Sequence, residues 1–273
     1  MIQPLSLTIE GSPRGSSLPP PLKWAGGKRW LAPHLLSLYE PHRHRRWVEL
    51  FAGGLAAALA LQPERALLND INPHLINFYR WIQRGLEITL PLRYDKELYY
   101  AYRRRFNELI RQGLWETQEA AMLFYYLNRT GYNGLCRFNR KGEFNVPFGK
   151  YKKVTYQEDF SIYKELFQKW EFSSLDFRQV NLQPDDFVYA DPPYDVEFTK
   201  YSPEGFSWQD QTDLAQLLAR HPGPVVISNQ ATERILKLYK DLEYKLYLLP
   251  APRRISCDGN RQKALEVLAL RNL

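Results

Sequence analysis

The amino-acid sequence predicts an α/β protein in which a doubly wound sheet carries an inserted, mostly helical subdomain. Short apolar runs alternate with helix-like segments along most of the 273 residues. Several of these runs are apolar throughout, as in a parallel sheet that is covered on both faces. Residues 85–155 break the alternation with two long helical stretches and a loop-rich segment. The chain is therefore expected to build one large core and to attach a smaller subdomain to it.

The strand-like runs are bounded by turn or helix signals. They are Trp47–Phe51, Ala66–Asn69, Glu171–Leu175, Phe187–Ala190, Val225–Asn229, Tyr244–Leu249 and Leu265–Leu270. Helix-like segments separate most of them and cover Lys28–Tyr39, Leu55–Leu61, Pro73–Arg84, Tyr156–Trp170, Trp208–Arg220 and Ala231–Lys240. The last two runs follow each other without a helix between them, so they can pair antiparallel.

The insert begins with two predicted helices, Tyr94–Gln112 and Thr117–Arg129. The sequence TGYNGLCRFNRKGEFNVPFGKYKK follows, and its Gly and Asn content predicts loops and a hairpin. Residues 21–84 and 156–273 are expected to form the main domain around this insert. Residues 1–20 are rich in Ser, Pro and Gly, and we expect a flexible tail outside the fold.

Composition excludes several classes of protein. No stretch approaches twenty apolar residues, so we expect no membrane span, and residues 1–20 lack the pattern of a signal peptide. The two cysteines, Cys136 and Cys257, have neither metal-ligand spacing nor a disulfide framework. We therefore expect a cytoplasmic protein without a metal.

The net charge is +7 and is unevenly distributed. Residues 71–160 hold 15 Lys or Arg and 9 Asp or Glu, which accounts for nearly all of the excess. A concentrated basic segment indicates a polyanionic partner such as nucleic acid, although many ordinary domains are mildly basic.

Glycines and an acid follow the first two strands. In VELFAGGLA, a strand runs into Gly53 and Gly54 and then into a helix. Glycines at this point let a nucleotide-like ligand approach the backbone closely, although a plain strand-to-helix turn is an equally good explanation. In LLNDINP, Asp70 ends the next strand, where an acid can accept hydrogen bonds from ribose hydroxyls. Alternatively, Asp70 or Asn72 caps the following helix.

The segment LKWAGGK precedes the first strand. Trp24 can stack on a base and Lys28 can meet a carboxylate. By itself the segment is better explained as a loop that enters a helix.

The segment DPPY follows the apolar run Phe187–Ala190. Asp191 then lies at the carboxyl edge of the sheet, where doubly wound folds bind ligands. The lone pair of an amine on a planar ring is delocalised, and two acceptors that bond its two N–H groups would free it. Asp191 and the carbonyl of Pro192 can be those acceptors, while Tyr194 offers a face to the ring. Chemistry is favoured here over a solvated surface turn.

The loop segment from Asn128 to Lys153 interleaves basic residues with Tyr, Phe and Asn. Arginines can neutralise phosphates or bond guanine, Asn can bond adenine, and a tyrosine can stack into a gap. The alternative is a solvated loop whose charges touch only water.

Together these segments resemble the Dam family of DNA adenine-N6 methyltransferases over about residues 20–270, and their order along the chain matches. The resemblance implies a seven-stranded, Rossmann-like methyltransferase sheet with an inserted DNA-recognition subdomain at 85–155. It also implies methyl transfer from S-adenosyl-L-methionine to an adenine flipped out of duplex DNA, often within GATC. We expect a monomer that binds double-stranded DNA.

The resemblance also implies roles for individual residues. The catalytic set is Asp191, Pro192, Pro193 and Tyr194. The expected cofactor contacts are Trp24, Lys28, Glu49, Phe51, Gly53, Asp70, Asp176 and Phe177. The expected DNA contacts are Lys23, Tyr132, Asn133, Leu135, Arg137, Pro147 and Lys150.

The sequence departs from the family pattern at two places. The first motif of the family is Phe-x-Gly-x-Gly, and Leu55 replaces the last glycine here. The segment after DPPY, which starts at Asp195 and covers the flipped base in the family, is shorter.

Rival functions remain open at this point. One is methylation of another planar amine, such as cytosine N4, adenine in RNA or a glutamine amide, and another is a DNA-binding relative without catalysis. A nicotinamide oxidoreductase is disfavoured because no GxGxxG motif is present.

Overall fold

A computed structural model describes residues 2–4, 18–24, 26–194, 205–251 and 264–273. Within these residues, eight strands form one sheet in the order β1-β7-β8-β6-β5-β2-β3-β4. The strands are β1 (Ile2–Pro4), β2 (Trp47–Glu49), β3 (Ala66–Asn69), β4 (Trp170–Ser173), β5 (Phe187–Ala190), β6 (Val225–Gln230), β7 (Lys245–Ala251) and β8 (Ala264–Arg271). β4, β3, β2, β5 and β6 run parallel, whereas β8 lies between β6 and β7 and is antiparallel to both.

The predicted α/β sheet is confirmed, and each of the seven expected strands is found within three residues of its predicted bounds. The eighth strand corrects the expectation for the first residues. Residues 2–4 belong to the segment expected to lie outside the fold, yet they pair in parallel with β7. β7 would otherwise end the sheet with unpaired N–H and C=O groups, and β1 satisfies some of them.

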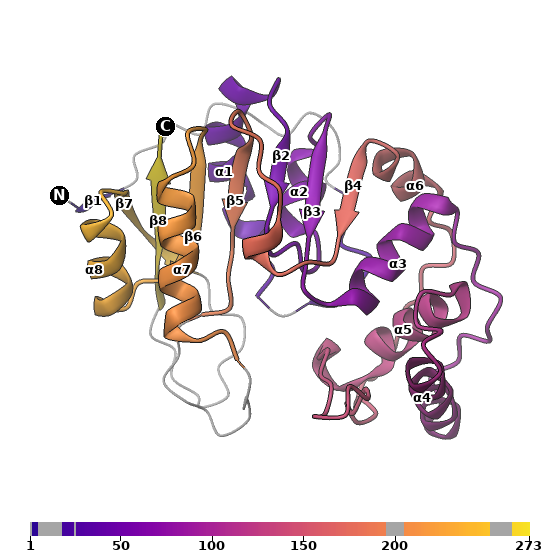
Figure 1. Ribbon diagram of the computed structural model, residues 1–273. Helices are drawn as coiled ribbons and strands as arrows, with labels where there is room; N and C mark the ends of the chain where they lie inside the picture. Colours follow the sequence, from indigo (N-terminus) through magenta and orange to yellow (C-terminus); the bar gives the residue numbers. More distant parts are fainter. Residues whose placement is uncertain (1, 5–17, 25, 195–204, 252–263) are drawn as a thin grey trace.

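Helices cover both faces of the sheet (Figure 1). They are α1 (Ala32–Tyr39), α2 (Ala56–Leu61), α3 (Pro73–Arg84), α4 (Lys96–Arg111), α5 (Gln118–Thr130), α6 (Ser161–Phe167), α7 (Trp208–Ala219) and α8 (Glu233–Asp241). The helix α1 starts later than predicted because a 3-10 turn precedes it and Pro33 occupies its first turn. The helix α6 is shorter than predicted at both ends, and at its end Trp170 already belongs to β4.

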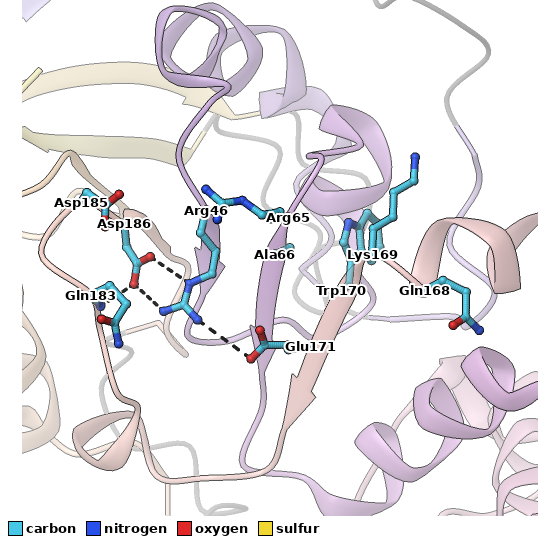
Figure 2. A pocket seen from close by; sticks show the side chains of 10 residues that line it. All are labelled: Arg46, Arg65, Ala66, Gln168, Lys169, Trp170, Glu171, Gln183, Asp185 and Asp186. Carbon is cyan, nitrogen blue, oxygen red and sulfur yellow. Dashed lines mark hydrogen bonds and ion pairs between the residues drawn. The ribbon is translucent and has the colours of Figure 1, made fainter.

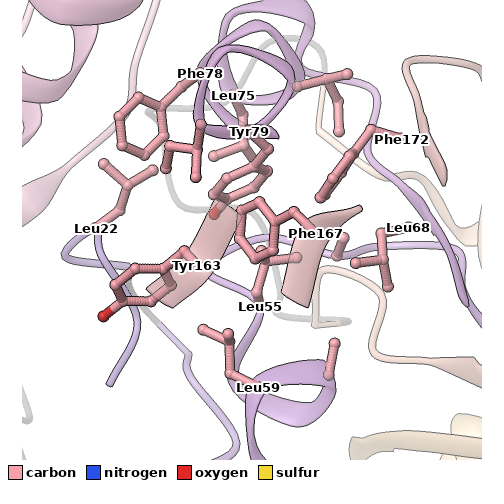
Figure 3. Packing of buried hydrophobic residues seen from close by; sticks show 14 of the residues in the cluster. Leu22, Leu55, Leu59, Leu68, Leu75, Phe78, Tyr79, Tyr163, Phe167 and Phe172 are labelled. Atoms are coloured by element: carbon pink, nitrogen blue, oxygen red, sulfur yellow. The ribbon is translucent and has the colours of Figure 1, made fainter. Parts of the chain in front are cut away.

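Two buried apolar clusters correspond to the two faces. The larger one contains residues of α1, α2, α3, α5 and α6, and Figure 3 shows part of it, including Leu55 and Leu59 of the α2 region and Phe167 of α6. The smaller one contains residues of α7 and α8, such as Leu214 and Ile235. A parallel sheet covered on both faces explains why strands such as β3 and β5 are buried at every residue.

The helices of the insert pack onto α3. The rings of Phe78 in α3 and Tyr125 in α5 stack with centroids 5.6 Å apart, and Nδ2 of Asn77 donates to the carbonyl of Trp115 at 2.8 Å. In Figure 1, α4 and α5 lie on the side to which the arrows of β2, β3 and β4 point. The insert therefore lies toward the edge where the parallel strands end.

Candidate active site

A cavity of about 630 Å³ opens at the carboxyl ends of the parallel strands. It brings together ten of the predicted catalytic and cofactor residues, which are Trp24, Lys28, Glu49, Phe51, Gly53, Asp70, Asp191, Pro192, Pro193 and Tyr194. Leu135, predicted to contact DNA, also lines it, and so does the exposed side chain of Ile71. Segments that are distant in the sequence thus meet at one sheet edge, as expected for a doubly wound fold.

Asp191 directly follows β5 and is held from two sides. The hydroxyl of Ser228 in β6 donates to its Oδ1 at 2.8 Å, and Nζ of Lys28 lies 3.4 Å from the same oxygen. Burial raises the pKa of Asp191 to about 6, although Lys28 and Ser228 pull it back toward the usual value. The carboxylate is thus fixed in place, and it is ionised at neutral pH.

Lys28 is buried among acidic and phenolic groups. Its Nζ lies 3.3 Å from Oε1 of Glu266 and also contacts the hydroxyl of Tyr194. Tyr194 in turn donates its hydroxyl to Glu266, and burial is the main cause that raises the pKa of Tyr194, so its phenol stays neutral. Lys28 thus joins the segment before α1 to the turn of residues 191–194 and to β8.

Glu266 was missed by sequence reasoning. It belongs to the run LEVLAL, where a lone acid stands in an otherwise apolar strand, and only 7% of it is exposed. Because β8 is antiparallel, its first residues arrive at the carboxyl edge of the parallel strands. An acid near the start of a central antiparallel strand is the signal that would have found it.

The glycine turn after β2 is held by Asp70. The N–H of Gly53 donates to Oδ2 of Asp70 and the N–H of Asn72 to its Oδ1, each at 2.9 Å. The hydroxyl of Tyr79 donates to the carbonyl of Gly53 at 2.7 Å. The capping alternative is realised by Asn72, whose side chain accepts the N–H groups of His74 and Leu75 at the start of α3. Asp70 is therefore left to fix the turn and face the cavity.

The indole of Trp24 lies directly on the glycine turn. A Cβ atom on Gly53 would lie 2.7 Å from Nε1 of Trp24, and one on Gly54 would lie 2.7 Å from its Cβ. Contacts this short are not found for real side chains, so only glycine fits at both positions. These glycines let the indole, rather than a ligand alone, approach the backbone.

Leu55, which replaces the last glycine of the family motif, has φ +60° and ψ +27°. This left-handed conformation is the one that glycine adopts without cost and leucine does not. Leu55 is fully buried in the larger apolar cluster. The backbone therefore keeps the geometry of the glycine motif, and burial of the leucine side chain offsets the strain.

Glu49 ends β2 and is almost completely buried. Nε1 of Trp47 donates to its Oε1 at 2.8 Å. Burial raises the pKa of Glu49 to about 8, and the negative Asp191 acts in the same direction. Glu49 is thus mainly protonated at pH 7 and can donate a hydrogen bond into the cavity.

Asp176 and Phe177 do not line the cavity. The side chain of Asp176 accepts the N–H of Arg178 at 2.9 Å and pairs with its guanidinium at 3.3 Å. Phe177 is buried, and its ring contacts that of Phe51 with centroids 5.8 Å apart. Phe177 thus supports a cavity residue from behind, while Asp176 caps a short turn.

The predicted DNA contacts lie mostly on the surface of the insert. Tyr132, Asn133, Arg137, Pro147 and Lys150 are exposed. The expected hairpin is present in part, because Gly131 bridges Phe148 and Phe138 bridges Phe144 in antiparallel fashion. Nε of Arg137 donates to Oδ1 of Asn145 at 2.9 Å, which holds the guanidinium across this hairpin.

Lys23 is half-buried, as is Leu135, whereas the other predicted DNA contacts are exposed. Its Nζ donates to the carbonyl of Arg129 at 2.7 Å and lies 3.5 Å from the ring centroid of Tyr151. Burial, with help from the charge of Arg129, lowers the pKa of Lys23 to about 8. In this structure the side chain ties the segment before α1 to the insert.

A second cavity, of about 440 Å³, lies at the opposite edge of the sheet (Figure 2). There Nε and Nη2 of Arg46 donate to the carboxylate of Asp186 at 2.9 and 2.8 Å. Nη1 of Arg46 lies 4.0 Å from Oε2 of Glu171. These residues precede or begin β2, β5 and β4, so the arrangement joins the amino ends of three strands. We interpret it as structural, since ligands of such sheets bind at the carboxyl edge.

The sequence predicts neither a metal site nor a membrane-spanning helix. Within the described ranges, no group of three or more His, Cys, Asp or Glu side chains is placed to hold a metal ion. No helix found there is long and apolar enough to cross a membrane. Cys257 and the shortened segment from Asp195 to residue 204 lie outside the residues that the structure describes.

Comparisons with known proteins agree with the predicted resemblance. The model of the D12 class N6 adenine-specific DNA methyltransferases matches residues 24–254. The DNA adenine methylases of Vibrio cholerae serotype O1 and Escherichia coli K12 are each 36% identical over 274 residues, which cover 91% of this chain and 94% of theirs. A type II methyltransferase of Lactococcus lactis subsp. cremoris is 33% identical, covering 92% and 95%.

Such an activity needs DNA and a methyl donor, and the site has both a basic insert and a cavity at the sheet edge. The rival readings without catalysis, or with a nicotinamide, have no support from these relatives. The chain belongs to the D12 class N6 adenine-specific DNA methyltransferases.

Proposed function

We propose that this protein transfers a methyl group from S-adenosylmethionine to N6 of an adenine flipped out of duplex DNA, with Asp191 and the Pro192 carbonyl as acceptors for the amine. The observation that carries the proposal is the placement of Asp191. Its carboxylate is fixed by Ser228 and Lys28 beside a large cavity at the carboxyl edge of the sheet.

The cavity suits a nucleoside with a charged tail. Its walls combine the aromatic faces of Trp24 and Phe51 with the exposed side chain of Ile71, which can cover a flat base. Each oxygen of Asp70 accepts one backbone N–H, so each keeps a lone pair for a ribose hydroxyl. The chemistry of the lining residues therefore fits S-adenosylmethionine.

We assign roles to the cofactor residues on this basis. Phe51, backed by Phe177, and Ile71 hold the adenine end, and Asp70 holds the ribose. Trp24, Glu49 and Lys28 hold the amino-acid end, and Gly53 lets the indole lie close. When bound, the cofactor would supply a methyl group on a positively charged sulfur, and the site residues would hold the amine close to it.

The catalytic residues act on the amine. Asp191 accepts one N–H and the Pro192 carbonyl accepts the other, which frees the nitrogen lone pair. Tyr194 holds the adenine ring by stacking. Pro192 and Pro193 keep the two acceptors stiff, because their rings fix the backbone. The methylated amine then loses one proton, first to Asp191 or to solvent, and the carboxylate is restored on release.

DNA binding is assigned to the insert. We propose that Lys150 and its basic neighbours neutralise phosphates, that Arg137 and Asn133 bond base edges, and that Tyr132 and Leu135 fill the gap left by the flipped adenine. Leu135 supports this idea, because it belongs to the insert and also lines the cavity. Residues 85–155 would thus act as the target-recognition subdomain and the rest of the fold as the catalytic domain.

Further parts of the proposal come from the sequence and not from the structure. They are the target GATC, action as a monomer, and a place in the prokaryotic cytoplasm where the DNA lies. Expression in a methylation-free bacterial host, followed by genome-wide mapping of N6-methyladenine, tests the target sequence and the base together. N4-methylcytosine instead of N6-methyladenine would contradict the proposed substrate.

The role of Asp191 is tested by substitution. Asp191→Ala should abolish transfer of a tritiated methyl group to DNA while the protein still binds S-adenosylmethionine and DNA. Asp185→Ala is a matched control, since Asp185 is an exposed acid at the opposite sheet edge, and it should keep full activity. Full activity of Asp191→Ala would refute the mechanism.

A further inference from the structure

The catalytic turn contains two residues without a backbone donor. Pro192 and Pro193 have no N–H, so within this turn their peptide groups offer only carbonyl acceptors. The Pro192 carbonyl must nevertheless stay in one place if it is to accept the amine. A donor from another part of the fold is therefore needed to hold the turn through a different carbonyl.

Gln211 in α7 supplies such a donor. Its Nε2 donates to the carbonyl of Pro193 at 2.8 Å. The side chain is only 1% exposed, so water does not compete for this hydrogen bond. The bond occupies the Pro193 carbonyl and leaves the carbonyl of Pro192 for the substrate.

The direction of this hydrogen bond is fixed by a backbone group. The N–H of Gln230, which can only donate, bonds Oδ1 of Asn229 at 2.8 Å. Nδ2 of Asn229 then faces away and donates to Oε1 of Gln211 at 3.0 Å and to the hydroxyl of Tyr239 at 3.1 Å. With its oxygen occupied, Gln211 must turn its nitrogen toward Pro193.

We infer that Gln211 is a positioning residue for methyl transfer, oriented by Asn229 and acting through the Pro193 carbonyl. Gln211 is buried behind the turn, so it acts on the substrate only by keeping the Pro192 carbonyl and the Asp191 carboxylate in a fixed relative position. The inference deepens the proposed function and rests on it, because this relative position matters only if the two acceptors bind the amine.

Steady-state kinetics test the inference. Gln211→Met keeps the size of the side chain and removes the donor, so kcat should fall by about 10- to 100-fold, as expected for a small misplacement of a reacting group. The KM values for DNA and for S-adenosylmethionine should stay within about twofold, since neither ligand contacts Gln211. An unchanged kcat, or a change in KM alone, would overturn the inference.

Gln209→Met is the matched control for this substitution. Gln209 lies two residues earlier in α7, is exposed, and donates to Oδ1 of Asp213 at 2.7 Å. It makes a side-chain hydrogen bond of the same kind at the surface, so its loss should leave kcat unchanged. A loss of kcat equal to that of Gln211→Met would show a general effect of α7 and would refute positioning by Gln211.

Gln211→Glu adds a pH-dependent readout. A protonated glutamate can donate its O–H to the Pro193 carbonyl, whereas an ionised one cannot. The kcat of this variant relative to wild type should therefore fall as pH rises, while the same ratio for Gln211→Met should stay flat. Equal kcat values for the two variants at every pH would contradict the role of the donor.

A measurement without catalysis separates this inference from the proposed function. In nuclear magnetic resonance spectra of the wild-type protein, the side-chain amide protons of Gln211 should be protected from exchange with solvent. Asn229→Leu should lower that protection. Unprotected amide protons in the wild type would overturn the inference, whereas an inactive wild-type protein with protected protons would overturn the proposed function and leave the hydrogen bond to Pro193 in place.

Discussion

The Nζ atom of Lys28 lies 3.4 Å from Oδ1 of Asp191, and both side chains are largely buried. Two carboxylates, Asp191 and Glu266, thus share one ammonium group. An unpaired buried carboxylate would destabilise the fold, and the positive charge of Lys28 offsets part of that cost for Asp191, the proposed catalytic residue. Burial raises the pKa of Asp191 and the charge of Lys28 lowers it, so that Asp191 can lose or gain its proton at a pH where the protein can be assayed.

The pH dependence of activity should report this balance. Burial raises the pKa of Asp191 to about 6, and only the ionised form presents both oxygens as acceptors. We expect kcat/KM, which reports the free enzyme, to rise as pH increases through about 6, with the slope of one proton. Rate measurements from pH 5 to pH 8 check this, and a kcat/KM that is constant across that range would contradict it.

The free energy of unfolding should also depend on pH through Asp191, but it should fall with rising pH where activity rises. Between its usual value of 3.8 and about 6, Asp191 holds a proton in the folded state that the unfolded state releases. The free energy of unfolding should therefore fall as pH rises through this window, by up to about 3 kcal/mol. Asp191→Asn should lack this component, so urea unfolding of both proteins at pH 4 and pH 7 isolates it.

The left-handed Leu55 predicts an unusual order of variants. Both Leu55→Ala and Leu55→Gly lose the buried side chain, but only glycine relieves the strain at φ +60°. Leu55→Gly should be more stable than Leu55→Ala by about 1 kcal/mol. Leu59 is a buried residue with ordinary helical geometry, so Leu59→Ala should be more stable than Leu59→Gly, again by about 1 kcal/mol. Denaturant unfolding of the four variants gives both differences, and the same order at both sites would contradict the interpretation.

The close packing of Trp24 predicts that a side chain at Gly54 lowers stability and cofactor binding. Gly54→Ala would place Cβ 2.7 Å from the Cβ of Trp24. We expect a loss of about 1–3 kcal/mol of stability and weaker binding of S-adenosylmethionine by calorimetry. Gly27→Ala is the control, because its Cβ would lie at ordinary distances of 3.8 Å from the Trp24 carbonyl and 3.9 Å from Ala56. Equal behaviour of the two variants would contradict the model of the cavity wall.

The salt dependence of DNA binding should locate the phosphate contacts. Lys150→Ala should weaken binding to all sequences and lower the slope of log affinity against log salt by about one. Lys169 is an exposed lysine at the opposite edge of the sheet (Figure 2), so Lys169→Ala should leave the slope unchanged. Equal slopes for Lys150→Ala and the wild type would remove Lys150 from the proposed interface.

Much of the fold could be predicted because its strands are buried on both faces and its turns carry glycine, proline and asparagine. The bounds of β3, β5 and α3 match their predictions to the residue. Features that depend on tertiary contacts could not be read this way. The position of Glu266 beside Lys28 depends on where β8 enters the sheet.

Two site residues show the same limit. Lys23 was expected to point toward DNA, and the local sequence gives no sign that Arg129 and Tyr151 enclose it. Gln211 reads as an ordinary polar residue of an amphipathic helix, and its contact with Pro193 joins segments that no local pattern relates. Motifs thus predict which residues line the cavity, whereas the residues that support them require the structure.

The place of β8 has a consequence for how the nascent chain matures. β6 and β7 are synthesised before β8, yet β8 separates them and pairs with both. Until that segment leaves the ribosome, β6 presents an open edge and Lys28 lacks one of its two acidic partners. Lys28, a residue of the proposed cofactor site, therefore gains its full set of acidic partners only after nearly all of this sequence has been translated.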